Sequence, residues 1–381
     1  PLWEEGVLLS PQHFQQQNVF NSYIYTTVIK LMGEFKWGCF HCEFDQQTLE
    51  LGKIKLNELQ ACLPDGTLID LQSGSGSVEV RDINSLSMRA RNTVLLALPV
   101  YQAHVPNLVD ESGAGNIPRR FVKKFEQVED LFSAEEAELA VEQLNLQIRF
   151  DFENNDDYVT CPIGVVEKNE NGALIWSKDY IPPLLSVAGS EVLLSCLNRI
   201  TLLVLSRIDN LSARRRARSE NTVDFSVSDS TLFWFLHGLN TIYPELKHLN
   251  DYPQQHPEEL YKLLVRLLGM LYTFKVGESV NEMESYNHFD LFGTFNRLEL
   301  KIRSLLDEVI PSPVIELSLE HTKSTHWRAQ VFDSRIDDNA EFYISAYSDS
   351  VVFTELQKQL PLVSKIGAPE DVERVINTAV M

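Results

Sequence analysis

The chain has 381 residues and a formal net charge of −21. Its length predicts two or three domains, and 44% apolar residues are typical of a folded protein with a sizeable core. The negative charge argues against nucleic acid and anionic membrane surfaces as partners, and no apolar run reaches the roughly 18 residues of a membrane span. Five scattered cysteines favour free thiols in a reducing cytoplasm.

Short strands are expected throughout residues 37–181. Apolar and polar residues alternate over residues 40–44, residues 93–101 are an apolar run of strand length, and Asn171-Gly172 is typical of a hairpin turn. Many short strands separated by turns predict a β-sandwich or a barrel. Further strands are expected at residues 145–152, 159–166 and 174–176.

Two cysteines within residues 39–42 are the most metal-like feature, because two thiolates at this spacing can share a zinc ion. A structural zinc site needs about four ligands, however, and the remaining cysteines stand apart: Cys62, Cys161 and Cys196. On a strand, Cys39 and Cys42 are also expected to point to opposite faces. We therefore predict no metal site here.

An acidic stretch at residues 151–157 is similar to the start of a calcium-binding loop. It lacks the glycine that the sharp turn of such a loop requires, and Pro162 stands where the bidentate glutamate should be. We expect an acidic hairpin tip instead.

No catalytic motif emerges. The chain lacks a nucleophile elbow, a phosphate-binding loop and a zinc-type histidine pair, and the glycines of residues 74–76 open a strand rather than a helix. The arginine run at residues 214–218 lies at a predicted helix end, where cations offset the helix dipole; binding of phosphate or an acidic partner is the alternative. We assign no catalytic, cofactor-binding or metal-ligating residue and do not expect an enzyme.

Helical patterns begin after Pro182-Pro183 and continue to residues 311–313. One helix starts sharply at Pro257, a residue that suits the first helical position, with two glutamates next to the positive end of the helix dipole. We expect an antiparallel four-helix bundle, with helices near residues 191–218, 228–243, from 257 onward and 289–309.

The last section returns to mixed structure, with strands expected near residues 314–319 and 341–346 and a helix near 350–359. Because the chain stops at Met381 inside a further helical pattern, we interpret this section as an incomplete domain. The sequence thus predicts an α+β multidomain protein. Its parts are a β-sandwich at residues 1–182, a four-helix bundle at 183–312 and a small, truncated α/β domain at 313–381.

The N-terminal stretch carries a distinctive signature: a tryptophan, a glutamate-glycine pair, an apolar pair and the run Pro11-Gln12-His13-Phe14-Gln15. It resembles the opening of the TssK family of bacterial type VI secretion proteins, also called ImpJ or VasE. Other landmarks similar to that family's follow in order: Trp37-Gly38, Pro64-Asp65-Gly66-Thr67, Tyr180-Ile181-Pro182-Pro183-Leu184-Leu185, His256-Pro257-Glu258-Glu259-Leu260-Tyr261 and Tyr286-Asn287-His288-Phe289-Asp290. The last departs from the family pattern, with Asn287 in place of an aspartate.

This resemblance implies a structural, non-enzymatic subunit without cofactors, in the cytoplasm at the inner face of the bacterial inner membrane. It implies a β-sandwich shell or shoulder domain, a helical neck and a C-terminal head, similar to receptor-binding proteins of siphophages. It also implies a homotrimer whose shoulder end docks onto the wedge proteins TssF and TssG. The head would contact the cytoplasmic parts of the membrane proteins TssL and TssM.

Four N-terminal residues are candidates for partner binding. Trp3 and Phe14 can act as aromatic anchors, while Gln12 and His13 offer uncharged hydrogen-bonding groups. The alternative is that Trp3, Leu8 and Phe14 close the sandwich core or form a trimer contact.

Three consecutive aromatics are candidates for the trimer contact: Phe233, Trp234 and Phe235. They cannot all face the core of one bundle, so we expect at least one at a subunit contact. Burial of all three within one chain would contradict this hypothesis.

Two rival interpretations remain. A phage-type receptor-binding or tail-adaptor protein would use its head to bind a cell-surface carbohydrate or protein. A hydrolase with a β-sandwich domain would need two convergent carboxylates in a groove, which no spacing in the chain suggests.

Overall fold

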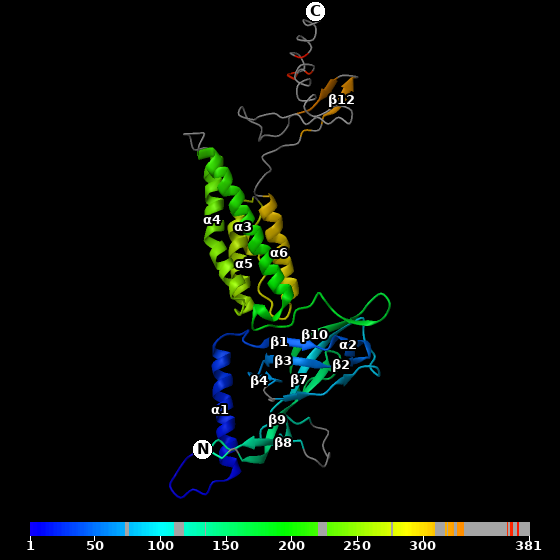
Figure 1. Ribbon diagram of the computed structural model, residues 1–381, viewed down its shortest axis with the longest axis vertical. Helices are drawn as coiled ribbons and strands as arrows, with labels where there is room; N and C mark the ends of the chain where they lie inside the picture. Colours follow the sequence, from blue (N-terminus) through cyan, green and yellow to red (C-terminus); the bar gives the residue numbers. More distant parts are fainter. Residues whose placement is uncertain are drawn as a thin grey trace, which may run out of the picture. The chain divides into compact units, whose positions relative to one another are not determined.

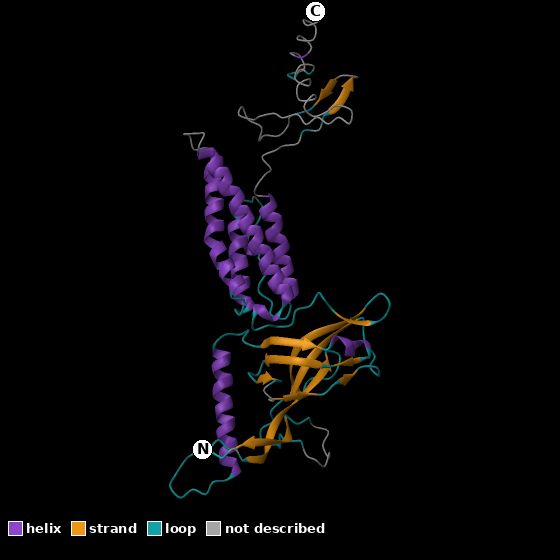
Figure 2. Cartoon of the chain, in the orientation of Figure 1, coloured by secondary structure: helices purple, strands orange, loops and turns teal. Residues whose placement is uncertain are grey.

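The computed structural model describes residues 1–72, 76–109, 118–133, 135–219, 227–275 and 277–308, and then 317, 319–323, 326–330, 364, 366–368 and 372. The chain divides into two compact units, Pro1–Pro311 and Ser312–Met381. The first unit carries the sheets and helices discussed below (Figures 1 and 2).

Of the second unit, the structure describes one antiparallel hairpin, β12 (Glu320–Lys323) with β13 (His326–Arg328). The strand expected at residues 341–346 and the helix at 350–359 lie outside the described residues. Of the strand expected at 314–319, only 317 and 319 are described, and neither has regular structure.

Two β-sheets make up the first half of the larger unit. The smaller sheet has the order β1-β3-β4, and the larger has the order β11-β10-β7-β9-β5, with β8 paired to β9. All pairs are antiparallel except β5 with β9. The strands are β1 (Gly38–Phe44), β3 (Leu56–Cys62), β4 (Leu68–Asp70), β5 (Gly76–Val78), β7 (Arg91–Pro99), β8 (Phe121–Glu129), β9 (Glu136–Phe150), β10 (Tyr158–Lys168) and β11 (Leu174–Trp176). A short pair, β2 (Lys53–Ile54) with β6 (Arg81–Asp82), and helix α2 (Gln46–Glu50) complete this region.

The sheets face each other across an apolar core. The apolar run predicted at residues 93–101 forms most of β7, whose residues from Val94 to Leu98 are all buried. Phe44 of β1 stacks on Trp176 of β11, with ring centroids 3.9 Å apart. Several expected strands are thereby confirmed. They form where apolar runs of strand length are buried between two layers.

Four helices follow: α3 (Glu191–Ser219), α4 (Val227–Asp251), α5 (Pro257–Tyr272) and α6 (Leu291–Glu308). Packing runs in a ring, with α3 against α4 and α6, and α5 against α4 and α6. The expected inward stripe of α5 is buried along its length: Leu260, Leu264, Leu267, Leu268 and Leu271. One expectation was wrong, because α4 continues past Tyr243 through Pro244, where burial of Leu246 and Leu249 stabilises the extra turns.

Two helices were not predicted at all, the short α2 and the much longer α1. Helix α1 (Pro11–Leu31) precedes the sandwich and stands beside it in Figure 1. Its start signal is Ser10 followed by Pro11 at the first helical position, and Gly33 follows its end. None of its residues is buried. Among the described helices of the whole chain, none is long and apolar enough to cross a membrane.

Candidate interaction surfaces and the junction that positions them

Several of the sequence landmarks meet where the sandwich joins the bundle. The residues before β1, the residue before α5 and the residues before α6 form one cluster of rings. His256 and His288 stack with centroids 5.5 Å apart, and Trp37 meets His288 edge-on at 4.9 Å. Phe35 and Tyr286 add a further edge contact at 5.1 Å. We call this cluster the junction: Phe35, Trp37, His256, Tyr286 and His288.

Hydrogen bonds define the state of both histidines. The Nε2 atoms lie 2.8 Å from main-chain carbonyl oxygens, His256 at Phe35 and His288 at Trp37, so each Nε2 must carry the proton and donate it. Each Nδ1 then accepts, from the main-chain N–H of Glu258 at 3.1 Å and from the Tyr286 hydroxyl at 2.9 Å. His256 is therefore neutral, and no ring nitrogen of either histidine is left for a ligand.

Burial favours the same neutral state. It lowers the pKa of His288 to about 4 and also lowers that of His256. His256 and His288 are almost wholly buried, at 7% and 1% exposure. The junction is thus a fixed structural joint between the chain entering β1 and the starts of α5 and α6.

A second set of landmarks closes the same joint. Gly38 has a φ of +124°, and a Cβ there would lie 2.5 Å from the carbonyl oxygen of Pro183. This close approach lets the N–H of Cys39 donate to that oxygen at 2.8 Å. Only glycine fits such a position. This explains why a glycine follows Trp37, next to the main chain of the Pro182-Pro183 landmark.

The landmark at residues 64–67 is a turn that supports α1. Arg120, whose side chain is only 9% exposed, pairs with Asp65 at 2.9 Å and donates to the carbonyl oxygen of Pro99 at 3.0 Å. Gly66 has a φ of +90°, and a Cβ there would lie 2.9 Å from Cβ of Thr26 in α1. The turn therefore fixes the C-terminal half of α1 against the sandwich.

The N-terminal candidates have a different environment. Trp3 and Phe14 are 54% and 60% exposed, and Leu8 is 88% exposed, so the interpretation that they close the sandwich core was wrong. The ring of His13 lies 5.8 Å from that of Trp3, and its Nδ1 contacts the Ser10 hydroxyl at 2.9 Å. Gln12 is exposed as well. None of the four candidates is buried, and His13 is the one that is half-buried.

The same openness extends along α1. The helix contains no acidic residue and one lysine, in a chain with 54 acidic residues. Large apolar side chains on it are substantially exposed: Phe14, Val19, Phe20, Tyr23, Ile24, Tyr25, Val28 and Leu31. A contact with the sandwich is made by Asn18, whose amide donates to Glu142 of β9 at 3.0 Å. A helix without acidic residues, with many exposed apolar side chains and no buried residue, is typical of a surface that another chain covers.

The three bundle aromatics divide as the hypothesis requires. Phe235 is buried at 1% exposure, whereas Phe233 and Trp234 are 45% and 60% exposed. The Arg215 guanidinium, from the predicted basic run, lies 5.4 Å from the Phe233 ring centre. Trp234 lines an open groove of about 640 Å³ between α4 and α5, whose floor includes Met270. The contact to another subunit itself stays a prediction.

The cysteines correct one expectation. The β1–β3 register shifts between Cys39 and His41, and this bulge turns both Phe40 and His41 outward. Cys39 and Cys42 consequently lie on one side, not on opposite faces, and the Cys39 thiol shares hydrogen bonds with those of Cys42 and Cys161. Those bonds raise the pKa values of Cys42 and Cys161 well above their usual range, so both stay protonated.

One group of side chains could hold a cation, within the described part of the chain. His41 Nε2 lies 3.4 Å from a carboxylate oxygen of Glu58 and 3.9 Å from one of Glu43, its neighbour across the strand pair. Sequence reasoning missed this group because Glu58 comes from another strand. All three side chains are about half exposed, so the imidazole itself can pair with both carboxylates in water.

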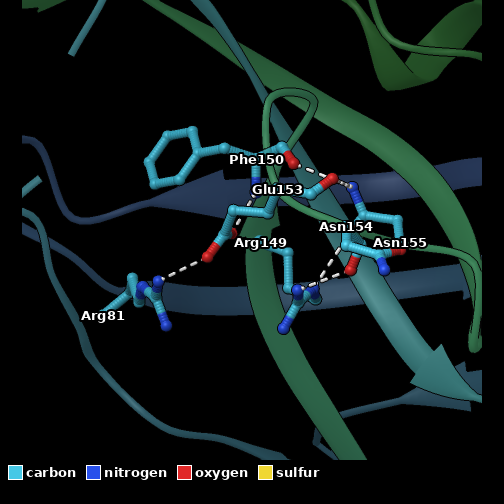
Figure 3. A network of polar contacts seen from close by, with 6 residues as sticks. All are labelled: Arg81, Arg149, Phe150, Glu153, Asn154 and Asn155. Carbon is cyan, nitrogen blue, oxygen red and sulfur yellow. Dashed lines mark hydrogen bonds and ion pairs between the residues drawn. The ribbon is translucent and has the colours of Figure 1, made fainter. Parts of the chain in front are cut away.

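The acidic stretch at residues 151–157 is the hairpin turn between β9 and β10, as expected (Figure 3). Glu153 accepts from the main-chain N–H of Phe150 at 2.7 Å and from Arg81 at 2.8 Å. Arg149 donates to the Asn155 side chain at 2.7 Å and to the Asn154 carbonyl at 2.8 Å. The side-chain oxygens of Glu153 and Asn155 are thus engaged by two arginines and the main chain.

Fold and surfaces together define a class: an α+β protein whose distinctive residues either build the joint between sheets and helices or stay exposed on the N-terminal segment. The chain belongs to the bacterial type VI secretion family that includes EvfL, ImpJ and VasE, whose profile it matches over residues 13–381. It is therefore a member of the TssK family, which confirms the resemblance predicted from the landmarks.

Individual relatives agree with this assignment. The chain is 27% identical over 380 residues to the type VI secretion system baseplate component TssK1 of Pseudomonas aeruginosa. The alignment covers 99% of this chain and 84% of that protein. It is similar to a chain in the TssK-TssF-TssG baseplate subcomplex, with a TM-score of 0.73 and 32% identity over 81% of this chain and 98% of that one. It is also similar to a crystal structure of TssK, with a TM-score of 0.72 and 25% identity over 88% and 75%.

Proposed function

We propose that this chain is a non-enzymatic baseplate subunit of a type VI secretion system, acting as a trimeric adaptor between the TssF–TssG wedge and the TssL–TssM membrane complex. It works in the cytoplasm at the inner face of the inner membrane, without cofactor or nucleic acid. The observation that carries the proposal is α1, a helix of 21 residues with no buried residue, in a member of the TssK family.

Physical chemistry supports a trimer formed through α1. Isolated helices are marginal in water, and α1 has no pair of opposite charges to stabilise it. Two copies of a chain with a net charge of −21 repel each other over most of their surfaces. They meet without that repulsion at α1, which has no acidic residue, and the exposed Phe233 and Trp234 provide a second apolar contact.

Each proposed domain corresponds to a consecutive part of the chain. The sheets would form the shoulder (1–182), the four helices the neck (183–312) and the remainder a head (313–381), in the manner of siphophage receptor-binding proteins. TssF and TssG are the proposed partners of the shoulder side, where Trp3, Gln12 and Phe14 are exposed and His13 is half-buried. A similar solved structure contains TssK together with TssF and TssG. The head is the proposed contact for TssL and TssM.

Light scattering tests the trimer. Phe20→Asp with Ile24→Asp places two charges one turn apart on α1 and should convert a trimer into monomers. Leu51→Asp is the matched control, because Leu51 is 70% exposed outside α1. A wild-type chain that is monomeric at micromolar concentration, or a trimer unaffected by the α1 variant, would contradict this part of the proposal.

Affinity purification of the tagged protein from its own bacterium, with mass spectrometry, tests the partners. Recovery of TssF- and TssG-like proteins together with TssL and TssM supports the adaptor role. Recovery of none of them, from cells shown to make all four, would favour a phage-type receptor-binding or tail-adaptor protein.

A further inference from the structure

The β8–β9 hairpin extends beyond the body of the sandwich. Among the described strands, β8 pairs only with β9, while β9 reaches β5 through residues 144–146 and β7 through residues 147–150. The paired segments 123–129 and 136–142 therefore form a two-stranded ribbon roughly 23 Å long at 3.3 Å per residue. None of these ribbon residues is buried.

The ribbon ends in the two most exposed apolar side chains of the described chain. Leu131 is 97% exposed and Phe132 is 99% exposed. Val128 and Leu139, at 40% and 49%, continue the apolar surface along the ribbon. A two-stranded ribbon is marginally stable alone in water. An aromatic side chain exposed at its tip also forgoes the hydrophobic stabilisation that burial against a partner would provide.

The tip is preorganised rather than loose. One carboxylate oxygen of Asp130 accepts from the main-chain N–H groups of Phe132 and Ser133, at 2.8 and 2.9 Å. The N–H of Asp130 donates to the carbonyl oxygen of Glu135 at 2.8 Å and closes the turn. A side chain presented by a fixed turn loses little conformational entropy on binding.

The charge around the tip is of one sign. Between Lys124 and Arg149 there is no basic residue, and the acidic residues there are Glu126, Glu129, Asp130, Glu135, Glu136, Glu138 and Glu142. Glu129 and Glu136 lie directly opposite each other in the ribbon register. Like charges so placed repel each other, so a cationic partner gains by meeting them.

We propose that Leu131 and Phe132 form a docking knob that inserts into an apolar pocket with a basic rim on a wedge protein of the TssF–TssG subcomplex. The acidic collar disfavours nucleic acid, anionic lipid and the acidic surface of a second copy. Phe132 supplies the aromatic anchor, and the glutamates steer the encounter and fix its orientation. This inference rests on the proposed function, since it names the surface that the wedge proteins recognise.

The test measures binding of the full chain to purified TssF–TssG subcomplex from the same bacterium, by biolayer interferometry at low and high salt. We expect Phe132→Ser to raise the Kd about tenfold or more, mainly through faster dissociation, and Glu129→Lys with Glu136→Lys to slow association and weaken its salt dependence. The control is Leu51→Ser, an exposed leucine elsewhere on the sandwich, which should bind as wild type. Thermal unfolding of all variants should match wild type, because the tip side chains are solvent-exposed.

The outcomes separate this inference from the function on which it rests. Wild type that binds TssF–TssG as tightly as Phe132→Ser overturns the docking knob and leaves the proposed function intact. Wild type that fails to bind overturns both. A Phe132→Ser variant with altered oligomeric state but unchanged Kd would identify the tip as a contact between copies of this chain and would also overturn the proposal.

Discussion

Helix α1 ends a few residues before Phe35, the first residue of the junction, yet α1 and the junction are opposites in burial. At the junction, His288 is 1% exposed and both of its ring nitrogens are hydrogen-bonded. Helix α1, by contrast, spans 21 residues without burying any. Both regions contain family landmarks. The comparison teaches that the landmarks are of two kinds, one that holds the fold together and one left free for other chains.

The largest effect should come from breaking the joint at its tightest point. Gly38→Ala puts a side chain at a φ of +124° and a Cβ within 2.5 Å of a main-chain oxygen, so the free energy of unfolding should fall by about 4 kcal/mol. The matched control is Gly172→Ala, with a φ of +78° and no neighbour within 4 Å, for which we expect about 1 kcal/mol. Urea unfolding measures both. Equal losses would show that the close approach to Pro183 is unimportant.

The two histidine environments provide the next contrast. His288→Ala removes a stacked ring and leaves the Trp37 carbonyl and the Tyr286 hydroxyl without a partner, so we expect a loss of about 3 kcal/mol. His13→Ala, on the exposed segment, should cost under about 0.5 kcal/mol. If both substitutions cost the same, the junction is not the joint described above.

Acid should weaken the junction selectively. The folded pKa of His288 is about 4, below the ordinary value of 6.5, so the unfolded chain binds the proton first as the pH falls. The stabilisation is complete above pH 6.5 and is lost on the way to pH 4, with about 1.5 kcal/mol lost between pH 6.5 and 5. His256, whose pKa is also lowered, adds in the same direction. A His288→Gln variant should show a shallower decline, and a decline as steep as that of wild type would contradict the assignment.

The smallest effect on the free energy of unfolding is expected in the exposed N-terminal segment. Trp3→Ala should change the free energy of unfolding by less than about 0.5 kcal/mol, because the side chain is 54% exposed. Calorimetry of dilute protein provides the measurement. A loss above about 2 kcal/mol would mean that the N-terminal segment packs against its own chain after all.

Much of the fold was predictable because it depends on local patterns. The α5 start at Pro257 and its leucine stripe follow from helix capping and periodicity, and both are present as expected. Helix α1 was missed although Ser10-Pro11 and Gly33 are start and stop signals, because aromatic and β-branched residues obscure its periodicity. The end of α4 was misplaced because packing of Leu246 and Leu249 outweighs the cost of Pro244.

The candidate sites depended more on long-range geometry. Family membership and the N-terminal signature were visible in the residues themselves, whereas the exposure of that signature was not, since packing of Trp3, Leu8 and Phe14 in the core was an open alternative. The bulge that brings Cys39 beside Cys42 was not, because a one-residue register shift is set by the partner strand. The approach of Glu58 to His41 was hidden for the same reason.

By itself, the sequence determined that the sheets precede the four-helix bundle, and it determined the family and the acidic character of the chain. Apolar period, proline and glycine placement and charge are local properties, so they can be read without coordinates. Only the tertiary structure decided that landmarks more than 200 residues apart, Trp37 and His288, share a hydrogen bond. It alone decided that α1 and the hairpin tip stay uncovered, since burial depends on which distant segments return to cover a side chain.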